Sequence, residues 1–130
     1  MGRGFPGQTP NPSNVNAIEG AGIPLATDPG VIVATAPGIK GGDVPKVIVY
    51  SGGILYGPAD TVTITVERDG VPFGSAYVTG SGGGAETIFT TFHWLDPDPG
   101  KGRPIYTVRA VALGGGGSAN AGRTITVFNV

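Results

Sequence analysis

The side chains best suited to chemistry lie between residues 93 and 102. His93 is the only histidine, and no second ligand-type residue stands at the strand or helix spacing of a metal site. Asp96 and Asp98 place two carboxylates on a loop rich in proline and glycine, but this loop lacks the further oxygen donors of an EF-type calcium site. We predict that His93 packs in the core or at an interface, and that both aspartates are solvated turn residues.

Two glycine-rich stretches, residues 80–84 and 114–118, are the other segments that invite a ligand. Neither precedes a predicted helix, and neither carries the Lys-Ser/Thr pair of a P-loop. The Gly-x-Ser-x-Gly motif of elbow-type serine hydrolases does not occur. We therefore predict that the protein is not an enzyme and uses no cofactor or metal. The rival is a hydrolase with an unrecognised site, which screening against esters and glycosides would test.

Composition argues against several kinds of partner. Charged residues make up 13% of the 130 residues and the net charge is −1, so no basic surface is expected for nucleic acid. There is no cysteine, hence no disulfide and no thiolate metal site. The first ten residues have no apolar run of the kind found in signal peptides and membrane anchors, so we expect no membrane contact.

Alternation of apolar and polar residues predicts β-strands throughout the chain. In residues 61–68, Val62, Ile64 and Val66 fall on one face, with threonines and a glutamate on the other. The 25 glycines and 12 prolines cluster between such segments, where tight turns need them. Many short strands joined in this way predict an all-β fold, an antiparallel β-sandwich of the jelly-roll type. The predicted strands are residues 17–20, 31–36, 46–51, 54–56, 61–68, 71–79, 86–95, 104–113 and 122–130.

Asp69 and Gly70 predict a hairpin with a two-residue type I′ turn. That turn fixes a register in which Phe73 and Tyr77 join the valines of residues 61–68 in the core. Pro72 is tolerated there if its strand lies at a sheet edge. The predicted partners are Arg68 with Val71, Glu67 with Pro72, Val66 with Phe73, Ile64 with Ser75 and Val62 with Tyr77.

Three predicted strands are apolar on both faces, which is more than one two-layer sandwich covers. Residues 31–34 and 46–50 run almost without a polar residue. Residues 86–95 place Ile88, Phe92 and Trp94 on one face, and Phe89, His93 and Leu95 on the other. A second subunit or an overlying loop would cover the outer face. The final strand reaches the chain end, and we expect it between two neighbouring strands, because a terminal strand is ordered only there.

Residues 1–14 are predicted to form an extended arm that precedes a single jelly-roll domain of residues 15–130. Their glycines and prolines exclude a helix or a ladder, and they offer too little apolar surface to order the arm alone. A neighbouring chain is expected to supply the missing contacts, and packing on the arm's own domain is the alternative. The positions expected at interfaces are Phe5, Pro6, Val47, Val49, Tyr50, Phe89, Trp94 and Phe128.

Several segments between Val47 and Val130 follow one another in an order found in a known family. They are Thr61 to Gly70, the loop of residues 80–84, Phe92 to Gly100, Tyr106 to Ala110, and Arg123 to Val130. This order resembles that of TNF/C1q-like jelly rolls in bacterial and phage surface proteins. The resemblance implies a compact homotrimer about a threefold axis, with the final strand and aromatic residues near that axis. The chain departs from the family's pattern in having no collagen-like stalk before the domain, and the short arm stands in its place.

A small, cysteine-free trimer with such an arm is similar to the decoration, or cement, proteins of tailed-phage capsids. The resemblance implies a structural viral protein on the capsid exterior of the virion, with the major capsid protein as its partner and capsid stabilisation as its role. The rival is a carbohydrate- or receptor-binding module of a tail fibre or bacterial surface, in which exposed Trp94, Tyr56 or Tyr77 forms a platform for a sugar.

Overall fold

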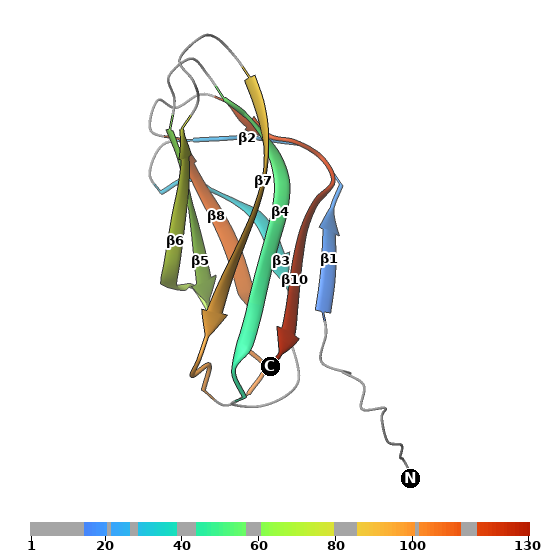
Figure 1. Ribbon diagram of the computed structural model, residues 1–130, viewed down its shortest axis with the longest axis vertical. Coiled ribbons are helices and arrows are strands. Elements are labelled where there is room, and N and C mark those ends of the chain that lie inside the picture. The colour runs from blue at the N-terminus through green and yellow to red at the C-terminus, as the bar shows by residue number, and fades with distance from the viewer. Residues whose placement is uncertain are drawn as a thin grey trace.

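The protein folds into two antiparallel β-sheets packed face to face (Figure 1). This computed structural model describes residues 15–20, 22–26, 29–38, 44–56, 61–79, 86–100, 102–112 and 117–130, and these contain strands and no helix. The arm predicted for residues 1–14 lies outside the described residues. The strands are β1 (Val15–Glu19), β2 (Ile23–Pro24), β3 (Val31–Ala36), β4 (Lys46–Tyr56), β5 (Thr61–Arg68), β6 (Val71–Thr79), β7 (Glu86–Asp96), β8 (Tyr106–Ala112), β9 (Ser118–Ala119) and β10 (Arg123–Asn129).

Sheet A contains β1, β10, β4 and β7 side by side, and the short β9 and β2 extend it beyond the end of β10. Sheet B has the order β3-β8-β5-β6. Figure 1 shows β7, β4, β10 and β1 as one layer, with β6, β5, β8 and β3 as the other. The prediction of an all-β sandwich is therefore confirmed. The final strand, β10, pairs with both β1 and β4, so its predicted central position is also confirmed.

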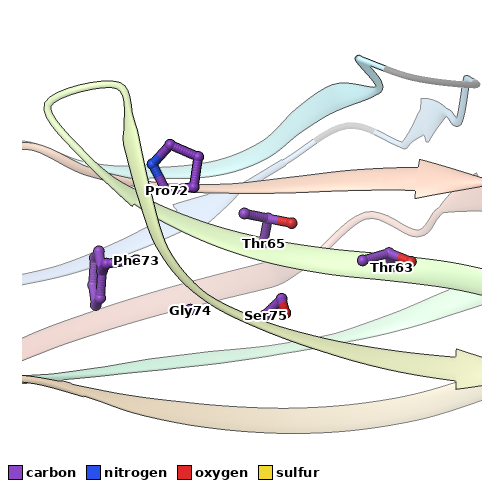
Figure 2. Close-up of a pocket in the computed structure, with 6 residues that line it drawn as sticks. All are labelled: Thr63, Thr65, Pro72, Phe73, Gly74 and Ser75. Atoms are coloured by element: carbon purple, nitrogen blue, oxygen red, sulfur yellow. The ribbon is translucent and has the colours of Figure 1, made fainter.

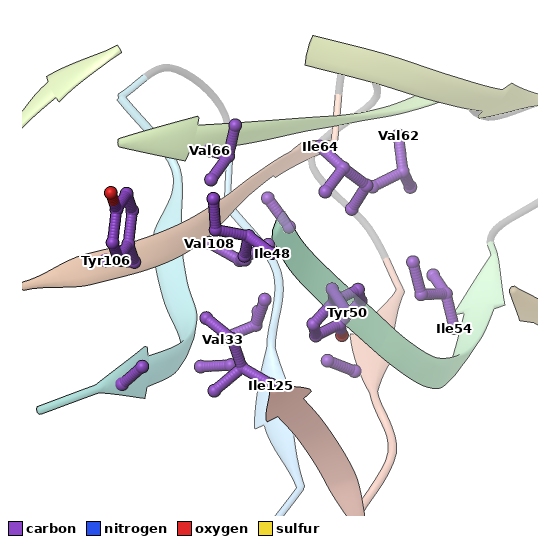
Figure 3. Close-up of a cluster of buried hydrophobic side chains, with 14 of the residues drawn as sticks. Val33, Ile48, Tyr50, Ile54, Val62, Ile64, Val66, Tyr106, Val108 and Ile125 are labelled. Carbon is purple, nitrogen blue, oxygen red and sulfur yellow. The ribbon is translucent and has the colours of Figure 1, made fainter. Parts of the chain in front are cut away.

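The core lies between the inner faces of the two sheets, where the alternation in the sequence places its apolar residues (Figure 3). Val62, Ile64 and Val66 of β5 are fully buried, as predicted. Burial of each such side chain contributes roughly 1.5–3 kcal/mol to folding. The other large residues of this core include Val33, Ile48, Tyr50, Ile54, Tyr106, Val108, Ile125 and Val127.

Strand β4 is one continuous strand where the sequence predicted two. Gly52 and Gly53 lie inside it instead of breaking it. A Cβ on Gly52 would lie 3.0 Å from the Tyr50 hydroxyl and 3.1 Å from Cγ of Arg123, and one on Gly53 would lie 3.1 Å from the amide nitrogen of Asn120. Glycine is needed here because neighbouring side chains approach the backbone closely, which is a common reason for glycine inside a strand.

The β5–β6 hairpin follows the predicted register for two pairs and then departs from it. Asp69 and Gly70 have φ values of 51° and 85°, as a type I′ turn requires, and the pairs Arg68–Val71 and Glu67–Pro72 form as predicted. A β-bulge then leaves Phe73 as an extra residue, so Val66 pairs with Gly74. The predicted partners beyond the bulge are therefore wrong. The actual partners are Thr65 with Ser75, Ile64 with Ala76, Thr63 with Tyr77 and Val62 with Val78.

The bulge changes which side chains of β6 enter the core. Phe73 packs against the core, with its ring edge-on to Tyr106 at a centroid distance of 5.9 Å. Tyr77, predicted in the core, pairs with Thr63 on the outer face and is 72% exposed. A shift of one residue moves every later side chain to the opposite face, which accounts for the error. Strand β6 is the edge of sheet B, so the condition set for Pro72 is met.

A second bulge, in β3, provides a link between the sheets. The register of β3 against β8 shifts between Ile32 and Ala34, which makes Val33 the extra residue. The Val33 carbonyl accepts a hydrogen bond of 2.7 Å from Nε of Arg123 in sheet A. Arg123 is only 1% exposed, and it also donates to the carbonyl oxygens of Ala119 and Asn120. This buried cation is thus held by backbone acceptors from both sheets, which offset the loss of water.

Candidate functional site

The outer face of sheet A carries a surface of apolar side chains on strands β4, β7 and β10. Ile48 and Tyr50 of β4 point into the core, so Val47 and Val49 lie on the opposite, outer face, where both are half-buried. Val47 pairs with Leu95 of β7 and with Phe128 of β10. These three residues form one apolar row across the sheet. The outer face of sheet A is defined here by Val47, Val49, Phe89, Thr91, His93, Leu95, Thr124, Thr126 and Phe128.

Two residues of this face project strongly into solvent. Phe89 is 75% exposed and Leu95 is 56% exposed. Phe89 pairs with Gly53 of β4, which has no side chain to cover the ring. At the other side of the sheet, Ile18 of β1 pairs with Thr124 and is 68% exposed. Exposed apolar side chains therefore stand at both the β7 and the β1 edges of the sheet, and the hydroxyl residues Thr124, Ser51 and Thr91 lie between Ile18 and the β7 edge.

This face is also uncharged. Its described positions on β4, β7 and β10 are apolar, hydroxyl-bearing or glycine, with His93 as the titratable side chain among them. Ser51 and Thr91, which form a cross-strand pair, satisfy each other by a hydrogen bond of 3.0 Å between their hydroxyls. Depletion of charge together with exposed apolar and aromatic groups is typical of the centre of a protein–protein interface.

The structure brings together some of the residues predicted at interfaces and separates others. Val47, Val49, Phe89 and Phe128 share the outer face of sheet A. Tyr50 lies on the inner face with no exposed surface, so the structure removes it from this set. Trp94 also faces inward, half-buried against the core beside Phe92 at a ring centroid distance of 6.1 Å. Phe5 and Pro6 lie outside the described residues. The alternation of residues 86–95 already placed Leu95 and His93 with Phe89, although neither was included in the prediction.

Asp96 is not the solvated turn residue that the sequence predicted. It ends β7 with 2% exposure, and both carboxylate oxygens accept hydrogen bonds from Nη1 of Arg68, at 2.6 and 2.8 Å. The Tyr106 hydroxyl donates to the same carboxylate at 2.7 Å. The pKa of Tyr106 is raised, mainly because burial disfavours the charged phenolate and secondly because of this hydrogen bond to Asp96. The cluster joins β7 of sheet A to β5 and β8 of sheet B, so its role is structural. Asp98, by contrast, is exposed.

The outer face of sheet B is different in kind, since it is rich in hydroxyls and contains an ion pair. Nε of Arg109 lies 2.9 Å from a carboxylate oxygen of Glu67, and the Thr107 hydroxyl donates to the other oxygen. Beside them is an open groove of about 620 Å³, which we call the β5–β6 groove (Figure 2). It is lined by Thr63, Thr65, Pro72, Phe73, Gly74 and Ser75. This groove was not predicted from the sequence, because it depends on the bulge at Phe73.

Among the described residues, no group of three or more His, Cys, Asp or Glu side chains is placed to hold a metal ion. In the same part of the chain there is no helix with the length and apolarity needed to cross a membrane. Comparison with models of protein families and with curated proteins finds no match to the chain. The candidate function therefore depends on the geometry of the two outer faces.

Proposed function

We propose that this protein is a structural component of a phage virion that decorates the outside of the assembled capsid and stabilises it. Copies of the chain associate as a homotrimer through the outer face of sheet A, and the N-terminal segments bind the major capsid protein. The observation that carries the proposal is the uncharged apolar surface of this face, with Phe89 at 75% exposure. Left in water, such a surface promotes association.

The strand order supports the jelly-roll assignment within this proposal. The longer strands of sheet A have the order β1-β10-β4-β7, and sheet B has the order β3-β8-β5-β6. If the two-residue strands β2 and β9 are set aside, six of the seven connections between these eight strands cross from one sheet to the other, and β5–β6 is the local hairpin, which agrees with a jelly roll. The threefold symmetry itself rests on the resemblance seen in the sequence.

The stabilising mechanism is thermodynamic and needs no chemical step. A protein that binds the assembled shell and not its separate subunits shifts the equilibrium towards the shell by mass action. Three capsid-binding segments in one trimer add avidity, because docking of the first raises the effective concentration of the others. Apolar surface buried between subunits supplies the affinity that holds the trimer together.

The proposal is tested by cosedimentation of the purified chain with expanded shells of the phage that encodes it. The full chain should saturate the shells and raise the temperature at which they disassemble. A variant lacking residues 1–14 should remain trimeric and lose shell binding. Absence of binding by the full chain would contradict the proposed function. Unchanged occupancy by the truncated variant would contradict the role given to the N-terminal segment.

A further inference from the structure

We infer that the β5–β6 groove on the outer face of sheet B is a binding site for a neutral saccharide. The site lies on the opposite side of the sandwich from the outer face of sheet A, and it does not depend on the proposed capsid role. The ligand class follows from three features of the groove, namely its hydroxyl groups, its lack of charge and its aromatic border.

Hydroxyl groups line the groove from two strands. Thr63 and Thr65 follow one another on the outer face of β5, about 7 Å apart by strand geometry, and Ser75 of β6 is the cross-strand partner of Thr65 (Figure 2). Each hydroxyl both donates and accepts hydrogen bonds. A sugar carries several hydroxyls of the same dual character, so it can form hydrogen bonds with more than one residue of the groove.

Charge is absent from the lining, which excludes groups that would select an ionic ligand. All six lining residues are uncharged. Two charged residues adjoin the lining, Glu67 as the partner of Pro72 and Arg109 as the partner of Thr65, and they pair with each other at 2.9 Å. A phosphate or carboxylate would find no free cation in the groove. A neutral polyol needs no charged partner, so the uncharged lining suits it.

Aromatic surface borders the hydroxyl row. Tyr77 lies two residues beyond Ser75 on the same face of β6 and pairs with Thr63, with 72% of its surface exposed. The apolar C–H face of a sugar packs against an aromatic ring, while its hydroxyls remain free to bond to the row. Pro72 is the apolar side chain at the other end of the groove, where Phe73 also belongs to the lining although its ring packs against the core. Tyr77 was one of the aromatic residues that the sequence suggested for a sugar platform, and it is the cross-strand partner of the lining residue Thr63.

The bulge at Phe73 creates this arrangement. Without it, Tyr77 would pair with Val62 and point into the core, as the unbroken register predicted. The extra residue brings Ser75 and Tyr77 to the outer face beside the threonines of β5. Bulges of this kind commonly re-aim side chains next to functional sites.

The test is a glycan array that contains neutral and acidic glycans, followed by titration of the ¹⁵N-labelled full chain with the strongest neutral binder. Saturable shifts are expected at the amides of residues 63–65 and 74–77. Tyr77→Ala should weaken binding about tenfold and Ser75→Ala about fivefold. Asp98→Ala is the control, because Asp98 is exposed in the loop after β7, outside the lining of the groove and outside the outer face of sheet A, and it should leave the affinity unchanged.

Three results would overturn the inference. These are no binding on the array, binding confined to acidic glycans, and an affinity that survives both Tyr77→Ala and Ser75→Ala. Both substitutions are at exposed positions, so the fold should persist, and the thermal midpoint of each variant verifies this. Loss of capsid binding in a separate assay has no bearing on these outcomes, so the inference and the proposed function can fail independently.

Discussion

Nη1 of Arg68 donates to both carboxylate oxygens of Asp96, at 2.6 and 2.8 Å, and so joins β5 of sheet B to the end of β7 in sheet A. The side chain of Asp96 is 3% exposed, whereas that of Arg68 is 29% exposed. The carboxylate therefore relies on its protein partners for solvation, and the guanidinium retains partial access to water. The pair is a link between the two sheets at one end of the core.

Asp96→Asn should lower the free energy of unfolding by about 2 kcal/mol. The amide keeps the volume of the carboxylate but removes its charge, and its NH₂ group faces the donors of Arg68 and Tyr106. Denaturant unfolding measures the change. Asp98→Asn, at an exposed position two residues further on, should have an effect of a few tenths of a kcal/mol at most. Equal stabilities of the two variants would contradict the structural role of Asp96.

Gly74→Ala should destabilise the fold by roughly 1–3 kcal/mol, because its Cβ has no room. That atom would lie 2.8 Å from Cδ1 of Trp94 and 3.2 Å from Cγ1 of Val66. Trp94 is the only tryptophan, so its fluorescence reports both the local change and unfolding. Gly20→Ala is the control, since a Cβ at Gly20 meets nothing within 4 Å. If the Gly74→Ala variant were as stable as this control, Gly74 of β6 would not lie as close to Trp94 of β7 as the structure shows.

Tyr50→Phe should raise the free energy of unfolding by about 1 kcal/mol at neutral pH. The Tyr50 hydroxyl is buried without a hydrogen-bond partner, so its removal relieves a desolvation cost. A loss of stability of 1 kcal/mol or more on this substitution would indicate that the hydroxyl is satisfied in the folded state.

The same tyrosine predicts a loss of stability in alkali. Burial raises the pKa of Tyr50 from 10.0 to about 12, although Arg123 opposes the shift. Above pH 10 the unfolded chain releases the phenolic proton while the folded chain retains it, so stability falls as the pH rises towards 12. The free energy of unfolding can be measured in urea at pH about 8 and about 11. Its decrease between these two pH values should be about 1 kcal/mol smaller in Tyr50→Phe than in the unsubstituted chain.

The strands could be predicted from the sequence where a period of two is unbroken, as it is for Val62, Ile64 and Val66. The same period placed Phe89 and Leu95 opposite Phe92 and Trp94, and the structure agrees. Prediction was wrong where one residue interrupts the period. The bulge at Phe73 was missed although Pro72 and Gly74 flank it, and residues of both types often mark a bulge in a strand; it reverses the faces of Ser75 and Tyr77.

Contacts between residues far apart in the chain also could not be predicted from the sequence. Gly52 and Gly53 suggested a break in the strand, yet they are accommodated because Arg123 and Asn120 approach β4 from the end of the chain. Asp96 looked like part of a solvated loop because its partner Arg68 is 28 residues away. Burial of a charged residue depends on such partners, and no periodicity reveals them.

Phe89→Asp should abolish self-association, because a charge at the centre of an apolar interface is desolvated without a partner. The substitution is at a position that is 75% exposed in the single chain, so the fold should be retained. Tyr77→Asp places the same charge on the outer face of sheet B, at a position with 72% exposure. This variant should still self-associate. Sedimentation velocity compares the two variants. If Tyr77→Asp dissociated and Phe89→Asp remained associated, the interface would lie on sheet B instead.

We propose that further copies of the chain cover the apolar, uncharged outer face of sheet A. The mass of the purified chain in solution, by native mass spectrometry or light scattering, shows whether they do. We expect a particle of three times the 13.0 kDa chain mass, held by a hydrophobic contact that persists at high salt. A monodisperse monomer at micromolar concentration would contradict it.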